Sequence, residues 1–188
     1  MTRCPRPVVR PAVGDKTAGL VAVLVSALTA GWLAAPAGAD EMHDHGKHVH
    51  GEVTVNIALE GRTLALGIDA PASQALGFEK SPRDDRERAA VKAVDDWFRS
   101  GRNMLGVPPA AGCRLTQAEF TPPKLGGGHA DYRGTYLFDC AAPQALAWIE
   151  VWALRRMQGL EKAEVNLVTP AGQRQETLRG GAVRVTLR

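Results

Sequence analysis

Cysteine is scarce in this chain, which contains only three among its 188 residues. None of them lies in a C-x-x-C pair, so the spacing typical of redox dithiols and zinc ribbons is missing. Methionine is also rare, with four residues, which does not favour a Cu(I) site. The motifs H-E-x-x-H and G-x-S-x-G and a phosphate-binding glycine loop are all absent. We therefore expect that the protein is not an enzyme.

The chain also lacks an excess of positive or negative charge when its first 39 residues are left out. Residues 1–39 carry four of the 23 Lys and Arg and one of the 20 Asp and Glu, so residues 40–188 hold 19 of each. The formal charge of +3 therefore belongs to the start of the chain. Without a basic stripe interleaved with aromatic residues, we expect no nucleic-acid partner.

The one long hydrophobic run lies near the N-terminus. Four basic residues precede the apolar stretch "AGLVAVLVSALTAGWLAA", and Ala37-Gly38-Ala39 supplies the small residues that signal peptidase needs. These features predict a signal peptide over residues 1–39, cleaved between Ala39 and Asp40. The product would then be periplasmic, with no stable membrane insertion. A retained membrane anchor is the alternative, although the run is at the short edge of the ~17–25 residues of a span.

Two cysteines, Cys113 and Cys140, remain after such cleavage. An exported protein matures in an oxidising compartment, so this pair predicts a disulfide. Two zinc thiolates are the alternative. Cys113 starts one predicted strand and Cys140 ends the next, which is where an antiparallel pair would bring them together.

Hydrophobic periodicity predicts a single α+β domain over residues 52–188, with mostly antiparallel strands and one long helix. Period-two alternation predicts a β-hairpin over residues 52–69. Ser81 as N-cap, Pro82 at the first position and Gly101 at the end delimit the helix. Further strands are predicted in "CRLTQAEF", "YRGTYLFDC", "LAWIEVWAL", "EVNLVTP", "AGQRQETL" and "AVRVTLR", with a helical turn at "RRMQGL".

Histidine is concentrated in one place: four of the five lie in "HDHGKHVHG", residues 43–51. If the alternation of the first strand is extended backwards, His48 and His50 share a face with Glu52. The Cα atoms of an H-x-H pair on a strand are about 7 Å apart, close enough for both rings to bind one metal at ~2.0–2.1 Å. We predict a Zn²⁺ site from these two histidines, with Glu52 as a ligand or as an acceptor of a ligand's hydrogen bond.

Three further residues complete the candidate set. His43 and His45 repeat the H-x-H spacing in the segment 40–51 and are predicted to be auxiliary ligands. His129 follows three glycines in the loop 121–128, which could bring it to a metal. A solvated tail with weak collective binding is the alternative to one fixed site.

The stretches "HVHGEVTVNIALEG", "APASQALGFEKSPRDDRERAAV", "AGC" and "GGHADY…YLFDC" occur in this order over most of the chain. Together they resemble the ZrgA-type family of periplasmic zinc-binding proteins, associated with zinc uptake in Gram-negative bacteria. The resemblance implies a zinc binder that assists a high-affinity zinc ABC importer or its binding protein. It also implies His48, His50 and His129 as ligands.

Two positions depart from that family. Members often carry histidine after "GFE", where this chain has Lys80. Many also have a long His/Asp/Glu-rich insertion before "HAD", where only "TPPKLGGG" stands here, so we expect a smaller zinc capacity. Two other functions stay open: an interaction module for a cell-envelope partner with incidental histidines, and a Cu- or Ni-binding periplasmic protein.

Overall fold

A computed structural model describes residues 51–187. Its first element is the predicted β-hairpin, formed by β1 (Glu52–Glu60) and β2 (Thr63–Pro71). The two strands pair antiparallel from Glu60 opposite Thr63 to Thr54 opposite Asp69. The alternation that predicted the hairpin is confirmed, because every second side chain of β1 from Val53 to Ile57 is buried.

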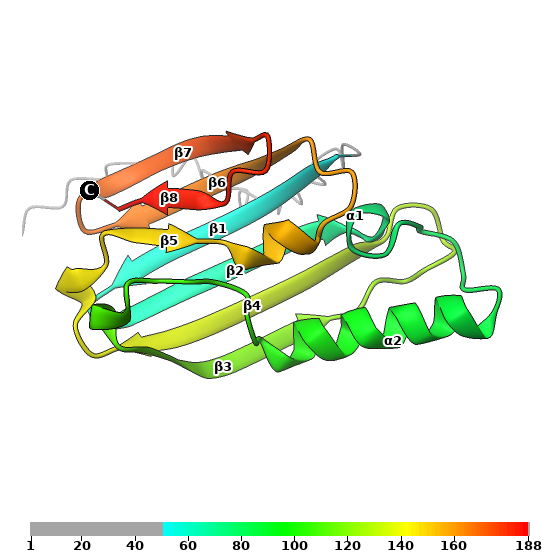
Figure 1. Ribbon diagram of the computed structural model, residues 1–188, viewed down its shortest axis with the longest axis horizontal. Coiled ribbons are helices and arrows are strands. Elements are labelled where there is room, and N and C mark those ends of the chain that lie inside the picture. Colours follow the sequence, from blue (N-terminus) through cyan, green and yellow to red (C-terminus); the bar gives the residue numbers. More distant parts are fainter. Residues whose placement is uncertain (1–50, 188) are drawn as a thin grey trace, which may run out of the picture. The chain divides into compact units, whose positions relative to one another are not determined.

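The hairpin lies in the middle of a six-stranded sheet of order β3-β4-β2-β1-β6-β7 (Figure 1). All neighbours are antiparallel except β1 and β6, which run parallel with Glu52 opposite Lys162. This mixed sheet with one long helix confirms the α+β single domain, whereas the parallel pair was not predicted. The remaining strands of the sheet are β3 (Cys113–Thr121), β4 (Asp131–Cys140), β6 (Lys162–Thr169) and β7 (Gly172–Arg179).

The long helix is α2 (Asp85–Ser100), which packs against β3 and β4. Its end at Gly101, where φ is 62°, is confirmed. The predicted start is wrong by about one turn. The N-cap is Asp84, whose carboxylate accepts a hydrogen bond from the Glu87 backbone N at 2.8 Å. Ser81 does not cap the helix, because its hydroxyl donates to the Leu125 carbonyl in the loop before β4.

A second layer covers the same face of the sheet. It contains α2, the short helix α1 (Ala72–Leu76) and a two-stranded sheet of β5 (Trp148–Glu150) and β8 (Arg184–Thr186), as Figure 1 shows. The strand predicted over "LAWIEVWAL" is thus much shorter. The chain leaves β5 because the Val151 and Ala153 backbone N–H groups donate to Val183 and Met104, at 2.8 and 3.1 Å. A 3₁₀ turn then covers Trp152–Arg156.

The hydrophobic core lies between these two layers. The alternating inward side chains of β1, β2, β4 and β6 are buried, and Phe98 of α2 stacks on Tyr132 of β4 with ring centroids 5.0 Å apart. The outward side chains of the same strands, among them Thr54, Asn56 and Asn166, are partly or fully exposed. Within residues 51–187, no helix is long and apolar enough to cross a membrane.

The predicted disulfide is present. Cys113 and Cys140 face each other across β3 and β4, and their sulfur atoms are 2.05 Å apart. The alternative of two zinc thiolates is therefore wrong, because sulfur in a disulfide is not a thiolate ligand.

Candidate metal centre

Three distant parts of the chain meet at one end of the six-stranded sheet. β1 begins there at Glu52, and β6 begins beside it at Lys162. On the other side of β1, the end of β2 lies against the start of β4, with Pro71 opposite Asp131. Because β2 alone separates β1 from β4 and runs antiparallel to both, the first residues of β1 and β4 lie at the same end of the sheet (Figure 1).

Glu52 lies on the outward face of the sheet and is engaged by a lysine. Its Oε2 is 3.0 Å from Lys162 Nζ, and Glu164 Oε1 is 3.2 Å from the same nitrogen. Hydrogen bonds to Glu52 and then to Glu164 raise the pKa of Lys162, so the lysine stays charged. Glu52 would therefore have to exchange this ammonium for a metal ion in order to act as a ligand.

His129 is exposed and stands two residues before β4, which begins at Asp131. Its neighbour Ala130 is buried, and the Ala130 carbonyl accepts a hydrogen bond from the Ala72 N–H at 2.7 Å. The backbone beside His129 is thus fixed at the end of β2. Before it, Gly126 and Gly128 have φ values of 90° and 103°, a left-handed conformation that residues with a Cβ rarely adopt.

The loop before His129 packs against the "GFEKSP" segment. The Gly126 N–H donates to the Glu79 carbonyl at 2.9 Å. Lys80, which stands where related proteins often have histidine, places its Nζ 2.6 Å from Glu87 Oε1 in the first turn of α2. The same nitrogen lies 4.5 Å from the centre of the Phe78 ring. Two of the four sequence stretches that carried the family resemblance, those with "GFEKSP" and "HAD", therefore lie side by side, and Lys80 binds the first turn of α2.

The predicted ligands His43, His45, His48 and His50 lie outside the described residues. Gly51, the first described residue, is buried, and its carbonyl accepts hydrogen bonds from the Glu161 and Lys162 N–H groups at 2.8 and 3.1 Å. Its φ is 85°, so the extended backbone of β1 starts only at Glu52. The alternation of β1 therefore does not carry across Gly51, and the direction of a histidine before Gly51 does not follow from the face that Glu52 occupies.

Residues 51–187 alone contain no group of three or more His, Cys, Asp and Glu side chains placed to hold a metal ion. Sequence reasoning missed Lys162 and Glu161, the residues that hold Glu52 and Gly51 in place. Both owe their position to the parallel pairing of β1 with β6, for which the sequence offers no local signal.

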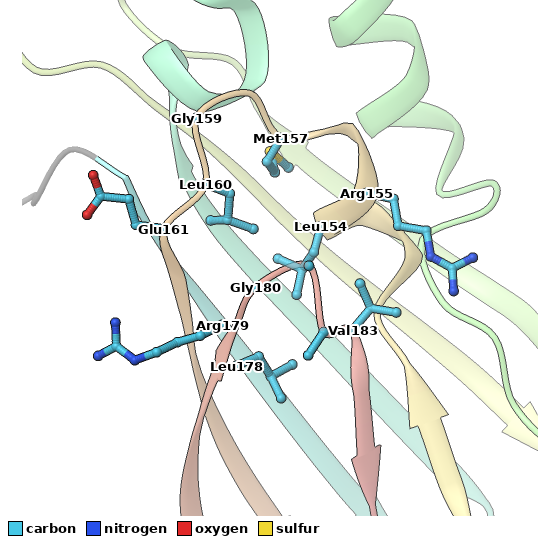
Figure 2. Close-up of a pocket in the computed structure, with 12 residues that line it drawn as sticks. Leu154, Arg155, Met157, Gly159, Leu160, Glu161, Leu178, Arg179, Gly180 and Val183 are labelled. Carbon is cyan, nitrogen blue, oxygen red and sulfur yellow. The ribbon is translucent and has the colours of Figure 1, made fainter.

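A hollow of about 420 Å³ adjoins this end of the sheet on the covered face. Figure 2 shows the side chains of Leu154, Leu160 and Val183 around it, whereas Arg155, Glu161 and Arg179 point away. Its lining is mainly apolar, with backbone from Gly159, Gly180 and Gly181 at the rim. Since no ionisable side chain points into it, the hollow offers no metal ligand.

Comparison with protein families identifies a relationship. The family model described as ZrgA family zinc uptake protein matches residues 47–187, which is well over half of the chain. The match includes His48, His50 and His129 and excludes His43 and His45. No curated protein matches the chain.

Proposed function

The chain belongs to the ZrgA family of zinc uptake proteins, and on this premise we propose that it binds Zn²⁺ in the periplasm and assists a high-affinity zinc importer. The family is associated with transport rather than catalysis. The protein either delivers zinc to the importer or to its binding protein, or buffers zinc near them. The disulfide between Cys113 and Cys140 fits the oxidising periplasm.

We place the zinc site at the end of the sheet where β1 and β4 begin. The observation that carries this placement is that "HVHG" leads into β1 and "HAD" leads into β4, with β2 alone between them. Neighbouring strands are about 4.8 Å apart, so the two starts lie roughly 10 Å from each other. Imidazoles that reach from both sides can bind one ion at about 2 Å per Zn–N bond.

In this proposal His48, His50 and His129 are the principal ligands and Glu52 supplies or supports a fourth. His43 and His45 bind additional zinc more weakly. Lys162 would keep the Glu52 side chain in position beside the site until zinc binds, because the two groups are 3.0 Å apart.

Calorimetric zinc titration of untagged protein tests this assignment. Each of His48→Ala, His50→Ala and His129→Ala should weaken the tightest binding event by roughly tenfold or more, ~1.4 kcal/mol. The double variant His43→Ala with His45→Ala should keep that event and lose weaker ones. Equal and slight losses in all variants would instead support collective binding by a tail. Wild-type protein that holds no zinc after incubation would favour the interaction module, and tighter Cu²⁺ or Ni²⁺ binding would favour the other metals.

A further inference from the structure

The two edges of the six-stranded sheet differ in regularity. On the β3 edge, the pairing with β4 shifts between Leu115 and Gln117, and Pro122 and Pro123 follow the strand. A bulge and prolines are the devices by which sheets discourage pairing with another chain. On the other edge, β7 pairs with β6 residue for residue over its whole length, without a shift or a proline.

The outer side of β7 lacks a strand partner among residues 51–187. Its one backbone hydrogen bond outside the pairing with β6 joins the Ala182 N–H to the Arg179 carbonyl, at the last residue of the strand. Figure 1 shows β7 at the border of the sheet, and none of the helices and strands of residues 51–187 lies beyond it. The exposed N–H and C=O groups of β7 therefore form a regular row that can accept another strand.

The sequence of β7 is self-complementary about its centre. Arg174 and Glu176 flank Gln175 and already form an ion pair, with Nε 2.7 Å from Oε1. Suppose that a second copy pairs antiparallel with β7, with Gln175 opposite the partner's Gln175. Arg174 then faces the partner's Glu176, and Glu176 faces the partner's Arg174. Moving the centre by one residue would place Arg174 opposite the partner's Arg174 or Glu176 opposite the partner's Glu176. Opposite charges across strands stabilise a pair and like charges destabilise it, so the register is specified.

From these observations we infer that β7 is the contact strand of a twofold-symmetric homodimer, paired antiparallel about Gln175. The same patch serves both copies, as a closed twofold interface requires. Two six-stranded sheets then join into one continuous sheet, and the two ends that carry Glu52 point in opposite directions. This inference does not depend on zinc binding, because β7 contributes no proposed ligand.

Charge reversal tests the register. In sedimentation equilibrium up to about 1 mM protein, wild type should show a concentration-dependent dimer. Arg174→Glu and Glu176→Arg should each weaken the dimer at least tenfold, and the double variant should restore it, because the two charges then exchange places in both copies. Arg174 also donates to the Thr186 carbonyl, so circular dichroism must show that each variant is folded. Monomers at every concentration, or a double variant that stays monomeric, would overturn the inference.

A cross-link provides the second test. In the full chain with Cys4→Ser, Gln175→Cys adds one thiol outside the Cys113–Cys140 disulfide. Facing residues on paired strands have Cβ atoms about 4.5–5.5 Å apart, so mild oxidation should give a covalent dimer. Gln117→Cys, exposed on the bulged β3 edge, is the matched control and should stay monomeric. Equal cross-linking of both variants would indicate random collision. Cross-linking of Gln117→Cys alone would assign the contact to the β3 edge.

Discussion

Lys162 is the residue that holds the side chain of Glu52, a zinc ligand in our proposal, at the start of β1. It contacts two carboxylates, Glu52 at 3.0 Å and Glu164 at 3.2 Å, and both are mostly buried at 21% and 19% exposure. If Glu52 exchanged the ammonium for a metal ion, as we propose, Glu164 would remain to neutralise Lys162. The exchange therefore leaves no unpaired charge, which lowers the cost of releasing Glu52.

These two carboxylates offer a matched pair of variants. Glu52→Gln should weaken the tightest zinc event by roughly tenfold, because an amide is a poorer zinc ligand than a carboxylate. Glu164→Gln removes the same charge from the same lysine and should change zinc affinity less than about twofold. Calorimetric titration gives both values. Similar losses in the two variants would mean that Glu52 acts through its charge alone.

Zinc affinity should also depend on pH. Imidazole binds zinc only when neutral, and its ordinary pKa is about 6.5. Protons therefore compete more strongly as pH falls, and the affinity of wild-type protein should drop steadily between about pH 7.5 and pH 5.5. The triple variant His48→Ala, His50→Ala, His129→Ala should lose most of this dependence. A flat profile for the wild type would exclude histidine as the main ligand.

At the scale of elements, the first turn of α2 is connected to the region of the candidate site. Glu87 in this turn pairs with Lys80, whose segment packs against the loop before His129. Hydrogen bonds from Lys80 and from the Arg83 N–H lower the pKa of Glu87 to about 2. Glu87 thus stays ionised down to that pH, and the support it gives to folding is lost only as pH falls from its unfolded value of about 4.5 through about 2. Neutral Glu87 could no longer hold Lys80.

The cap itself can be tested by substitution. Asp84→Ala removes the acceptor for the Glu87 N–H and should lower the free energy of unfolding by about 1 kcal/mol. Asp85→Ala is the control, since Asp85 is one residue on, is exposed and pairs only with Arg88 at the surface. Urea unfolding should show a clearly lower midpoint for Asp84→Ala. A lower midpoint for Asp85→Ala than for Asp84→Ala would mean that Asp84 is not the residue that caps α2.

Sequence periodicity predicted the elements whose signal is local. The hairpin of β1 and β2 was found because apolar residues alternate along both of its strands. The start of α2 was misplaced because Ser81 and Asp84 are both good caps, and only the contact of Ser81 with Leu125 separates them. β5 was overextended because its end is set by backbone contacts with Val183 and Met104, which are distant in sequence.

At the scale of the whole molecule, the disulfide ties β3 to β4, and these strands hold His129 in place. The bridge closes a separation of 27 residues, so replacing both cysteines by serine should lower the free energy of unfolding by roughly 3 kcal/mol. Guanidinium unfolding of the double variant measures this loss. The wild type should show no free thiol when denatured without reductant, and two titratable thiols in exported protein would contradict the bridge.

The candidate site could be predicted only in part. Residue types and the H-x-H spacing indicated metal binding, and the glycines before His129 indicated a turn there. The strands that follow "HVHG" and "HAD" in the sequence, β1 and β4, begin at the same end of the sheet because of the strand order, which no local pattern encodes. The extension of the β1 alternation to His50 ignored the left-handed backbone of Gly51, whose φ is 85°.

The parallel pairing of β1 with β6 has a consequence for the order of folding. Asn56 and Asn166 face each other across this pair although 110 residues separate them. The hairpin of β1 and β2 can form early, but the residues of β6 that pair with β1 are synthesised 110 residues later. Contacts between such distant residues slow folding, because a long loop must close before the contact stabilises anything. Until then one side of β1 stays open, and a chaperone that covers this side would protect the newly made protein from aggregation.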